Sequence, residues 1–137
     1  TVADLGVRTD TGFLTPRDMS LHQDSSYAVA VAPIRQRLSA APARVTDGEI
    51  LTLACMTGTE ADAGELARRY PHAVAEAMEG FGVIEAALRL ARIPRYVTEI
   101  RAISNEIGRR DRSTWDIPRA FDALANAFVT LVKEPLP

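Results

Sequence analysis

The chain has 137 residues, of which 47% are hydrophobic and 25% charged, a composition typical of a soluble globular protein. That length suits one domain, so we predict a single domain over residues 1–137. A net charge of −2 argues against a protein that binds nucleic acid through its phosphates, because such proteins are basic. The single cysteine, Cys55, cannot form an internal disulfide, and no apolar run approaches the ~20 residues that cross a bilayer. We therefore expect a cytoplasmic protein with neither a nucleic-acid nor a membrane partner.

The amino-terminal residues predict one short strand and one helix. The strand is expected near Leu5–Thr9, and a surface loop should follow it because Asp, Ser, Gly and Pro cluster there. A helix is expected within residues 28–40. Pro33 fits its first turn, and Ile34 and Leu38 are spaced i, i+4 to form an apolar stripe.

The strongest strand signal runs from Glu49 to Cys55. Its nearly continuous apolar character is typical of a central strand that is buried on both faces. The strand ends at a corner formed by residues 56–59, where Thr59 is placed to cap a helix over Glu60–Tyr70. Pro71 ends that helix.

Two further strand-and-helix pairs follow. The run Ala73–Ala77 predicts a strand that stops at Met78-Glu79-Gly80, and a helix is expected from Val83 to about Ala91. The run Tyr96–Ser104 predicts a third strand, which ends at Asn105. A charged loop then leads to a helix from about Ile117 to Val132. The apolar face of that last helix is predicted to contain Ala120, Phe121, Leu124, Phe128 and Leu131.

The alternation of strands and helices predicts an α/β fold. In open α/β sheets, ligands bind in the crevice beyond the carboxyl ends of the strands. Three predicted strand ends carry candidate site residues: Cys55-Met56-Thr57, Met78-Glu79-Gly80 and Ser104-Asn105. We expect these three corners to converge on one site.

The sequences at these corners resemble those of the purine nucleoside phosphorylase/nucleosidase superfamily. The resemblance rests on Glu76-Ala77-Met78-Glu79-Gly80 at a strand end and on the later run Glu99-Ile100-Arg101-Ala102-Ile103-Ser104-Asn105. Within that superfamily, the fuller run 75–83 is similar to the futalosine hydrolases, nucleosidases of the alternative menaquinone pathway. So is Ile103-Ser104-Asn105 followed by Gly108-Arg109-Arg110-Asp111-Arg112 and Trp115.

The resemblance covers most of residues 44–133 and implies a mixed, partly closed central sheet flanked by helices. It implies hydrolysis of the N-glycosidic bond of a 6-oxopurine nucleoside, converting futalosine to hypoxanthine and dehypoxanthine futalosine, with no metal or organic cofactor. The chain looks like the C-terminal portion of such a protein, because the strands and the water-activating Glu of the superfamily's first half have no counterpart before Thr1. An isolated portion would expose a sheet edge and an apolar face, which favours a homo-oligomer or association with a missing N-terminal half.

The resemblance gives Glu79 and Met78 roles at the sugar. Glu79 would accept hydrogen bonds from the ribose 2′- and 3′-hydroxyls, and its charge would favour the oxocarbenium-like cation formed as the glycosidic bond breaks. Met78 would pack on the sugar. The alternatives are a carboxylate that only caps the next helix and a methionine that only fills the core.

The remaining candidates would bind the base and the acidic end of the substrate. Adenine-specific relatives are expected to have Asp at the position of Asn105, whose amide can donate to a 6-oxo group and accept from a protonated N7. Met56 and Thr57 would line the base pocket. Arg101 and Arg110 would bind a substrate carboxylate, although charged loops are usually only solvated. Three functions stay open: a nucleosidase, a purine nucleoside phosphorylase and a non-catalytic nucleoside-binding scaffold.

Overall fold

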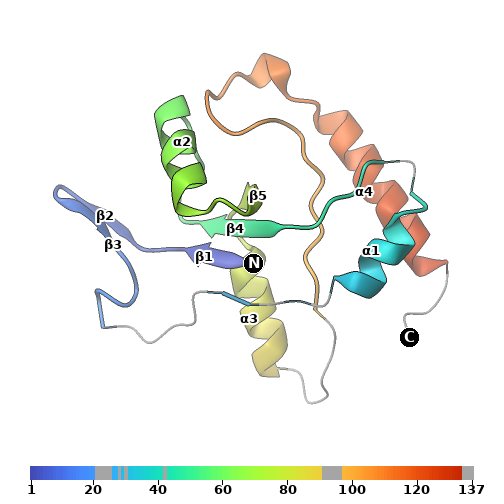
Figure 1. Cartoon of the computed structure of the whole chain (residues 1–137), viewed down its shortest axis with the longest axis horizontal. Coiled ribbons are helices and arrows are strands. Elements are labelled where there is room, and N and C mark those ends of the chain that lie inside the picture. Colours follow the sequence, from blue (N-terminus) through green and yellow to red (C-terminus); the bar gives the residue numbers. More distant parts are fainter. Residues whose placement is uncertain (21–25, 28, 30, 42, 91–96, 134–137) are drawn as a thin grey trace.

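A three-stranded parallel sheet lies at the centre of the computed structural model, which describes residues 1–20, 26, 27, 29, 31–41, 43–90 and 97–133. The strands β1 (Val2–Asp4), β4 (Glu49–Leu53) and β5 (Ala73–Ala77) lie in the order β1-β4-β5 (Figure 1). A separate antiparallel hairpin pairs β2 (Val7–Thr9) with β3 (Gly12–Leu14). The α/β class predicted from the sequence is confirmed.

Strand β4 is buried on both faces, as its apolar run predicts. Leu51 and Leu53 pack with Leu66 of α2 (Glu60–Arg69) in the main hydrophobic cluster. Successive side chains of a strand point to opposite faces, and Thr52 between them bonds to α3 (Gly80–Leu90). Figure 1 shows α2 and α3 on opposite sides of β4.

The helix ends follow the capping signals in the sequence. Thr59 caps α2, because its Oγ1 accepts a hydrogen bond from Asp62 N at 3.1 Å. Pro33 lies in the first turn of α1 (Ala32–Leu38), as expected. Helix α3 begins at Gly80, three residues before the predicted start at Val83. Glu79 therefore directly precedes the first turn of a helix.

Helix α4 (Ile117–Val132) has the predicted bounds, but its predicted apolar face is less buried than expected. It packs beside α1, and Arg37 Nη1 lies 3.4 Å from the carbonyl oxygen of Leu131. Leu124 and Leu131 are half-buried, whereas Phe121 is 68% exposed and Phe128 is 55% exposed. The apolar face of α4 is thus only partly covered in the described structure. No helix among the described residues is long and apolar enough to cross a membrane.

Two expectations about the strands were wrong. The surface loop expected after Thr9 contains β3, and Gly12 begins that strand with a φ of 147°, a conformation that favours glycine. Residues 97–103 form no strand, and Tyr96 lies outside the described residues. The composition of this run favours an extended backbone, but a strand also needs backbone N–H and C=O groups of a neighbour, and none of the described strands pairs with it. Figure 1 shows this segment (orange) running past the sheet toward η1 (Arg112–Thr114).

Substitution of Thr52 tests how α3 is attached to the sheet. Its side chain is 1% exposed, and its Oγ1 accepts a hydrogen bond from Phe81 N at 2.9 Å. Thr52→Val should lower the free energy of unfolding by about 1–3 kcal/mol, because the Phe81 N–H would be buried without an acceptor. Thr52→Ser keeps the acceptor and should lose less. Urea unfolding followed by circular dichroism measures both, and equal losses would contradict this role of the hydroxyl.

Candidate active site

Glu79 lies at the carboxyl end of β5, immediately before α3. Its side chain is 67% exposed, and its Oε2 lies 3.3 Å from Nη2 of Arg101. Met78, the preceding residue, is 46% exposed. A helix N-terminus stabilises a carboxylate that precedes it. The carboxylate is therefore accessible to a ligand, and its negative charge is stabilised by the N-terminus of α3 and by Arg101.

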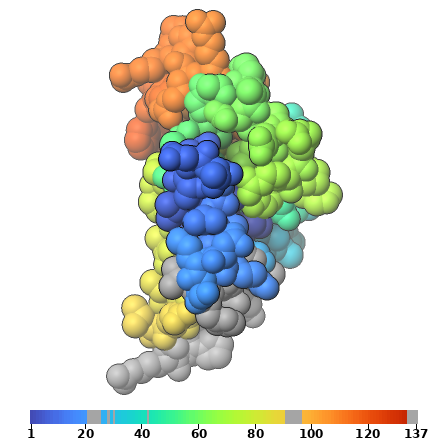
Figure 2. Space-filling model, turned by 90° about the vertical axis from the view of Figure 1, so that its left-hand side faces the viewer, coloured from blue at the N-terminus to red at the C-terminus, as the bar shows by residue number. Residues whose placement is uncertain are grey.

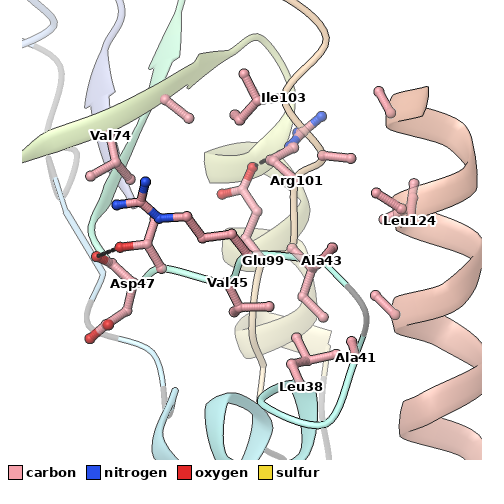
Figure 3. A pocket seen from close by; sticks show the side chains of 18 of the residues that line it. Leu38, Ala41, Ala43, Val45, Asp47, Val74, Glu99, Arg101, Ile103 and Leu124 are labelled. Carbon is pink, nitrogen blue, oxygen red and sulfur yellow. Dashed lines mark hydrogen bonds and ion pairs between the residues drawn. The ribbon is translucent and has the colours of Figure 1, made fainter. Parts of the chain in front are cut away.

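Arg101 also contacts a second carboxylate, that of Glu99. Arg101 Nε donates to Glu99 Oε1 at 2.8 Å, and the Glu99 side chain is only 9% exposed (Figure 3). Glu99 and Arg101 are two residues apart in a segment that belongs to no strand or helix, and their hydrogen bond shows that the two side chains lie on one side of the backbone. One guanidinium thus joins a buried carboxylate to an exposed one.

Gly80 makes room for this arrangement. A Cβ atom at Gly80 would meet both carboxylate oxygens of Glu99. The first residue of α3 must therefore lack a side chain while Glu99 occupies this position.

The corner after β4 is connected to β5 by a different carboxylate. Glu76 accepts hydrogen bonds from Thr57 N at 3.1 Å and from Thr57 Oγ1 at 2.5 Å. Met56 and Thr57 line a cleft of about 270 Å³ together with Cys55 and residues of β1 and α2. This cleft does not include Glu79 or Asn105.

The charged loop after Asn105 packs against the start of α2. Arg109 N donates to Glu60 Oε1 at 3.1 Å, and a Cβ at Gly58 would lie 3.9 Å from Arg110 Cδ. Figure 2 shows this loop (orange) against α2 (green). The guanidinium carbon of Arg110 lies 5.1 Å from the centre of the Trp115 ring, within cation–π range.

Asp111 organises the short helix η1 at the end of this loop. Its carboxylate accepts hydrogen bonds from the hydroxyl and the backbone N–H of Ser113, and these bonds lower the pKa of Asp111. Asp111 therefore stays ionised and caps η1.

Asn105 is half-buried, and both ends of its amide bond to neighbouring residues. Ser104 Oγ donates to Asn105 Oδ1 at 2.8 Å, and Asn105 Nδ2 donates to the Glu106 carbonyl oxygen at 2.8 Å. The structure records no hydrogen bond between Asn105 and Glu79, although both are described. It brings together Glu79 with Arg101, and the Thr57 corner with Arg110, but gives no contact that joins these two groups.

A second cleft in the described part of the chain is larger, with a volume of about 660 Å³. It is lined by α1, α4, the segment before β4, and residues 98–103 (Figure 3). Of the seven predicted site residues, it includes Arg101 but not Glu79, Met78, Met56, Thr57, Asn105 or Arg110. It lies beside the first residues of β4 and β5, whereas Glu79 and Thr57 follow their carboxyl ends.

Sequence reasoning missed Glu76 and Glu99 as parts of the site. Glu76 interrupts an otherwise apolar strand, and Glu99 lies two residues before Arg101. Both are charged residues within predicted strands, and that feature of the sequence could have identified them as candidates. Among the described residues, no group of three or more His, Cys, Asp or Glu side chains could hold a metal ion.

Comparison with known proteins confirms the resemblance found in the motifs. The chain is 43% identical over 134 residues to a futalosine hydrolase of Acidothermus cellulolyticus, covering 94% of this chain and 52% of the relative. It is 44% identical over 127 residues to a futalosine hydrolase of Streptomyces coelicolor, covering 93% of this chain and 52% of the relative. The chain therefore spans about half the length of the curated relatives it matches. No family model and no solved structure matches it.

The two glycines at the start of α3 give a matched pair of variants. Gly80→Ala should lower the free energy of unfolding by about 1–3 kcal/mol, because the new Cβ would collide with the Glu99 carboxylate. A Cβ at Gly82 would meet nothing within 4 Å, so Gly82→Ala should stabilise the helix by up to about 1 kcal/mol. Chemical denaturation measures both changes. A Gly80→Ala variant at least as stable as Gly82→Ala would show that Glu99 does not occupy this space.

Proposed function

We propose that this chain is the nucleoside-binding portion of a futalosine-hydrolase-type enzyme. The identity of 43–44% to two futalosine hydrolases over nearly the whole chain is the observation that carries the proposal. The reaction is hydrolysis of the N-glycosidic bond of a 6-oxopurine nucleoside, which releases hypoxanthine from futalosine in menaquinone biosynthesis.

In this proposal Glu79 binds the ribose. Its exposed carboxylate has one oxygen beside Arg101 and one that can accept hydrogen bonds from the ribose hydroxyls. The same negative charge favours the positive charge that develops on the sugar as the bond to the base breaks. Met78 supplies an exposed apolar surface for the sugar ring.

Asn105 is proposed to bind the base, with Met56 and Thr57 lining the base pocket. Its amide would exchange the bonds to Ser104 and Glu106 for bonds to the 6-oxo group and N7 of hypoxanthine. Of the two candidate arginines for the acidic end of the substrate, Arg110 is favoured, because Arg101 already donates to two carboxylates.

The proposal includes further polypeptide. The relatives have about as much chain again outside the matched region, and we assign the water-activating group to a segment equivalent to that region, with which this chain or a homo-oligomer of it would associate. Exposed apolar side chains such as Phe121 and Val132 of α4 and Val83 of α3 support such an association. A cytoplasmic location is part of the same proposal.

The test measures inosine binding by the chain, and turnover by the chain together with that further polypeptide, each with and without Glu79→Gln. Wild-type protein should bind inosine in calorimetry, and hypoxanthine release from futalosine should not require phosphate. Glu79→Gln should lower turnover by about 10²–10³-fold while retaining the wild-type circular dichroism spectrum, because a preorganised charge at the developing cation is lost. Asp10→Asn, in the exposed turn between β2 and β3 and outside both clefts, is the control. Release that depends on phosphate would favour a phosphorylase, and full activity of Glu79→Gln would remove Glu79 from the site.

Base preference is tested separately at Asn105. Asn105→Asp should shift binding from hypoxanthine toward adenine, because a protonated carboxyl can donate to N7 while its other oxygen accepts from a 6-amino group. The ratio of the two dissociation constants is expected to change about ten-fold or more. The control is Asn126→Asp on α4. An unchanged ratio for Asn105→Asp would place the base elsewhere.

A further inference from the structure

The guanidinium of Arg101 contacts two carboxylates at different distances. Its Nε lies 2.8 Å from Glu99 Oε1, while its Nη2 lies 3.3 Å from Glu79 Oε2. An arginine commonly binds one carboxylate through two parallel hydrogen bonds. Here the second bond goes to a different carboxylate, and the shorter contact is the one to Glu99.

Of the two carboxylates that contact Arg101, Glu99 is the buried one. Its side chain is 9% exposed, its carboxylate lies against Gly80 at the start of α3, and its Oε2 is buried without a hydrogen-bond partner. A buried carboxylate is costly unless a charge compensates it, and Arg101 supplies that charge. The Glu79 side chain at the other end is 67% exposed. The burial difference means that Glu99 determines where the guanidinium lies.

We propose that Glu99 is a positioning residue that holds Arg101 beside Glu79 and takes up most of its positive charge. This inference rests on the proposed function of Glu79 as the ribose carboxylate. Without the Glu99 charge, Arg101 would be free to bind both oxygens of Glu79 and would compete with the ribose hydroxyls. With Glu99 in place, Glu79 keeps one oxygen and most of its negative charge for the sugar.

The first arm of the test needs no ligand. In protein labelled with ¹⁵N-arginine, Glu99→Gln should shift or broaden the Nε–H signal of Arg101, and Glu79→Gln should leave it nearly unchanged. Glu85→Gln is the control, because Glu85 pairs with Arg89 within α3 and should alter only the Arg89 signal. An Arg101 signal that is unchanged in Glu99→Gln would overturn the proposal.

The second arm compares inosine with hypoxanthine, which lacks the ribose. Glu99→Gln should weaken inosine binding about ten-fold and leave hypoxanthine binding unchanged. In the Glu79→Gln background it should cause no further loss, because the two residues act on the same contact. Equal weakening of both ligands, or losses that add, would overturn the proposal.

Arg101→Lys keeps the test decisive if Glu99→Gln does not fold. A lysine ammonium lacks the planar fork that spans the two carboxylates, so this variant should show the same selective loss of inosine binding. Unchanged inosine binding in Arg101→Lys would count against the proposal. Wild-type protein that binds no inosine would instead overturn the proposed function, and the arginine signals would still decide whether Glu99 positions Arg101.

Discussion

The candidate site depends on the burial of β4 on both of its faces. Leu51 and Leu53 pack toward α2, so Thr52 must point the other way, toward α3. In that position its hydroxyl accepts the Phe81 N–H, one of the first-turn donors that an α-helix leaves without an internal partner. This bond fixes the start of α3 against the sheet. Because Glu79 immediately precedes α3, the same bond fixes where the exposed carboxylate lies.

A second constraint acts at the same helix end. Glu99 reaches the start of α3 from a segment that belongs to no strand, and it fits only because residue 80 is glycine. The backbone of α3, the side chain of Glu99 and the guanidinium of Arg101 therefore occupy one packed arrangement. Packing and charge cannot be varied independently here, since a larger residue at position 80 would move Glu99 and with it the partner of Arg101.

Local signals in the sequence predicted the elements around the site better than the contacts within it. The cap of α2, the first turn of α1 and the central strand β4 follow from neighbouring residues, and so does the corner at Glu79. Residues 97–103 were predicted as a strand from composition, but strand pairing depends on a distant neighbour that composition does not encode. Glu99 was missed for the same reason, because its role depends on Gly80, nineteen positions earlier in the chain. Of the predicted convergence of three strand ends, the structure records bonds from Thr57 to Glu76 of β5 and from Arg101 to Glu79, but Asn105 bonds only to its neighbours Ser104 and Glu106.

Arg101 connects the large cleft to the Glu79 corner. It lines the 660 Å³ cleft through the segment 98–103, and it also contacts Glu79 at the carboxyl end of β5. The cleft wall includes Glu99 as well, so both members of the ion pair beside Glu79 border this space. Polypeptide that occupied the cleft would contact Arg101 and Glu99 directly, and it would lower the local dielectric around their ion pair. Any assembly that fills the cleft would therefore strengthen the ion pair that, in the proposed function, leaves Glu79 available for the sugar, which links occupation of the cleft to the charge at the proposed site.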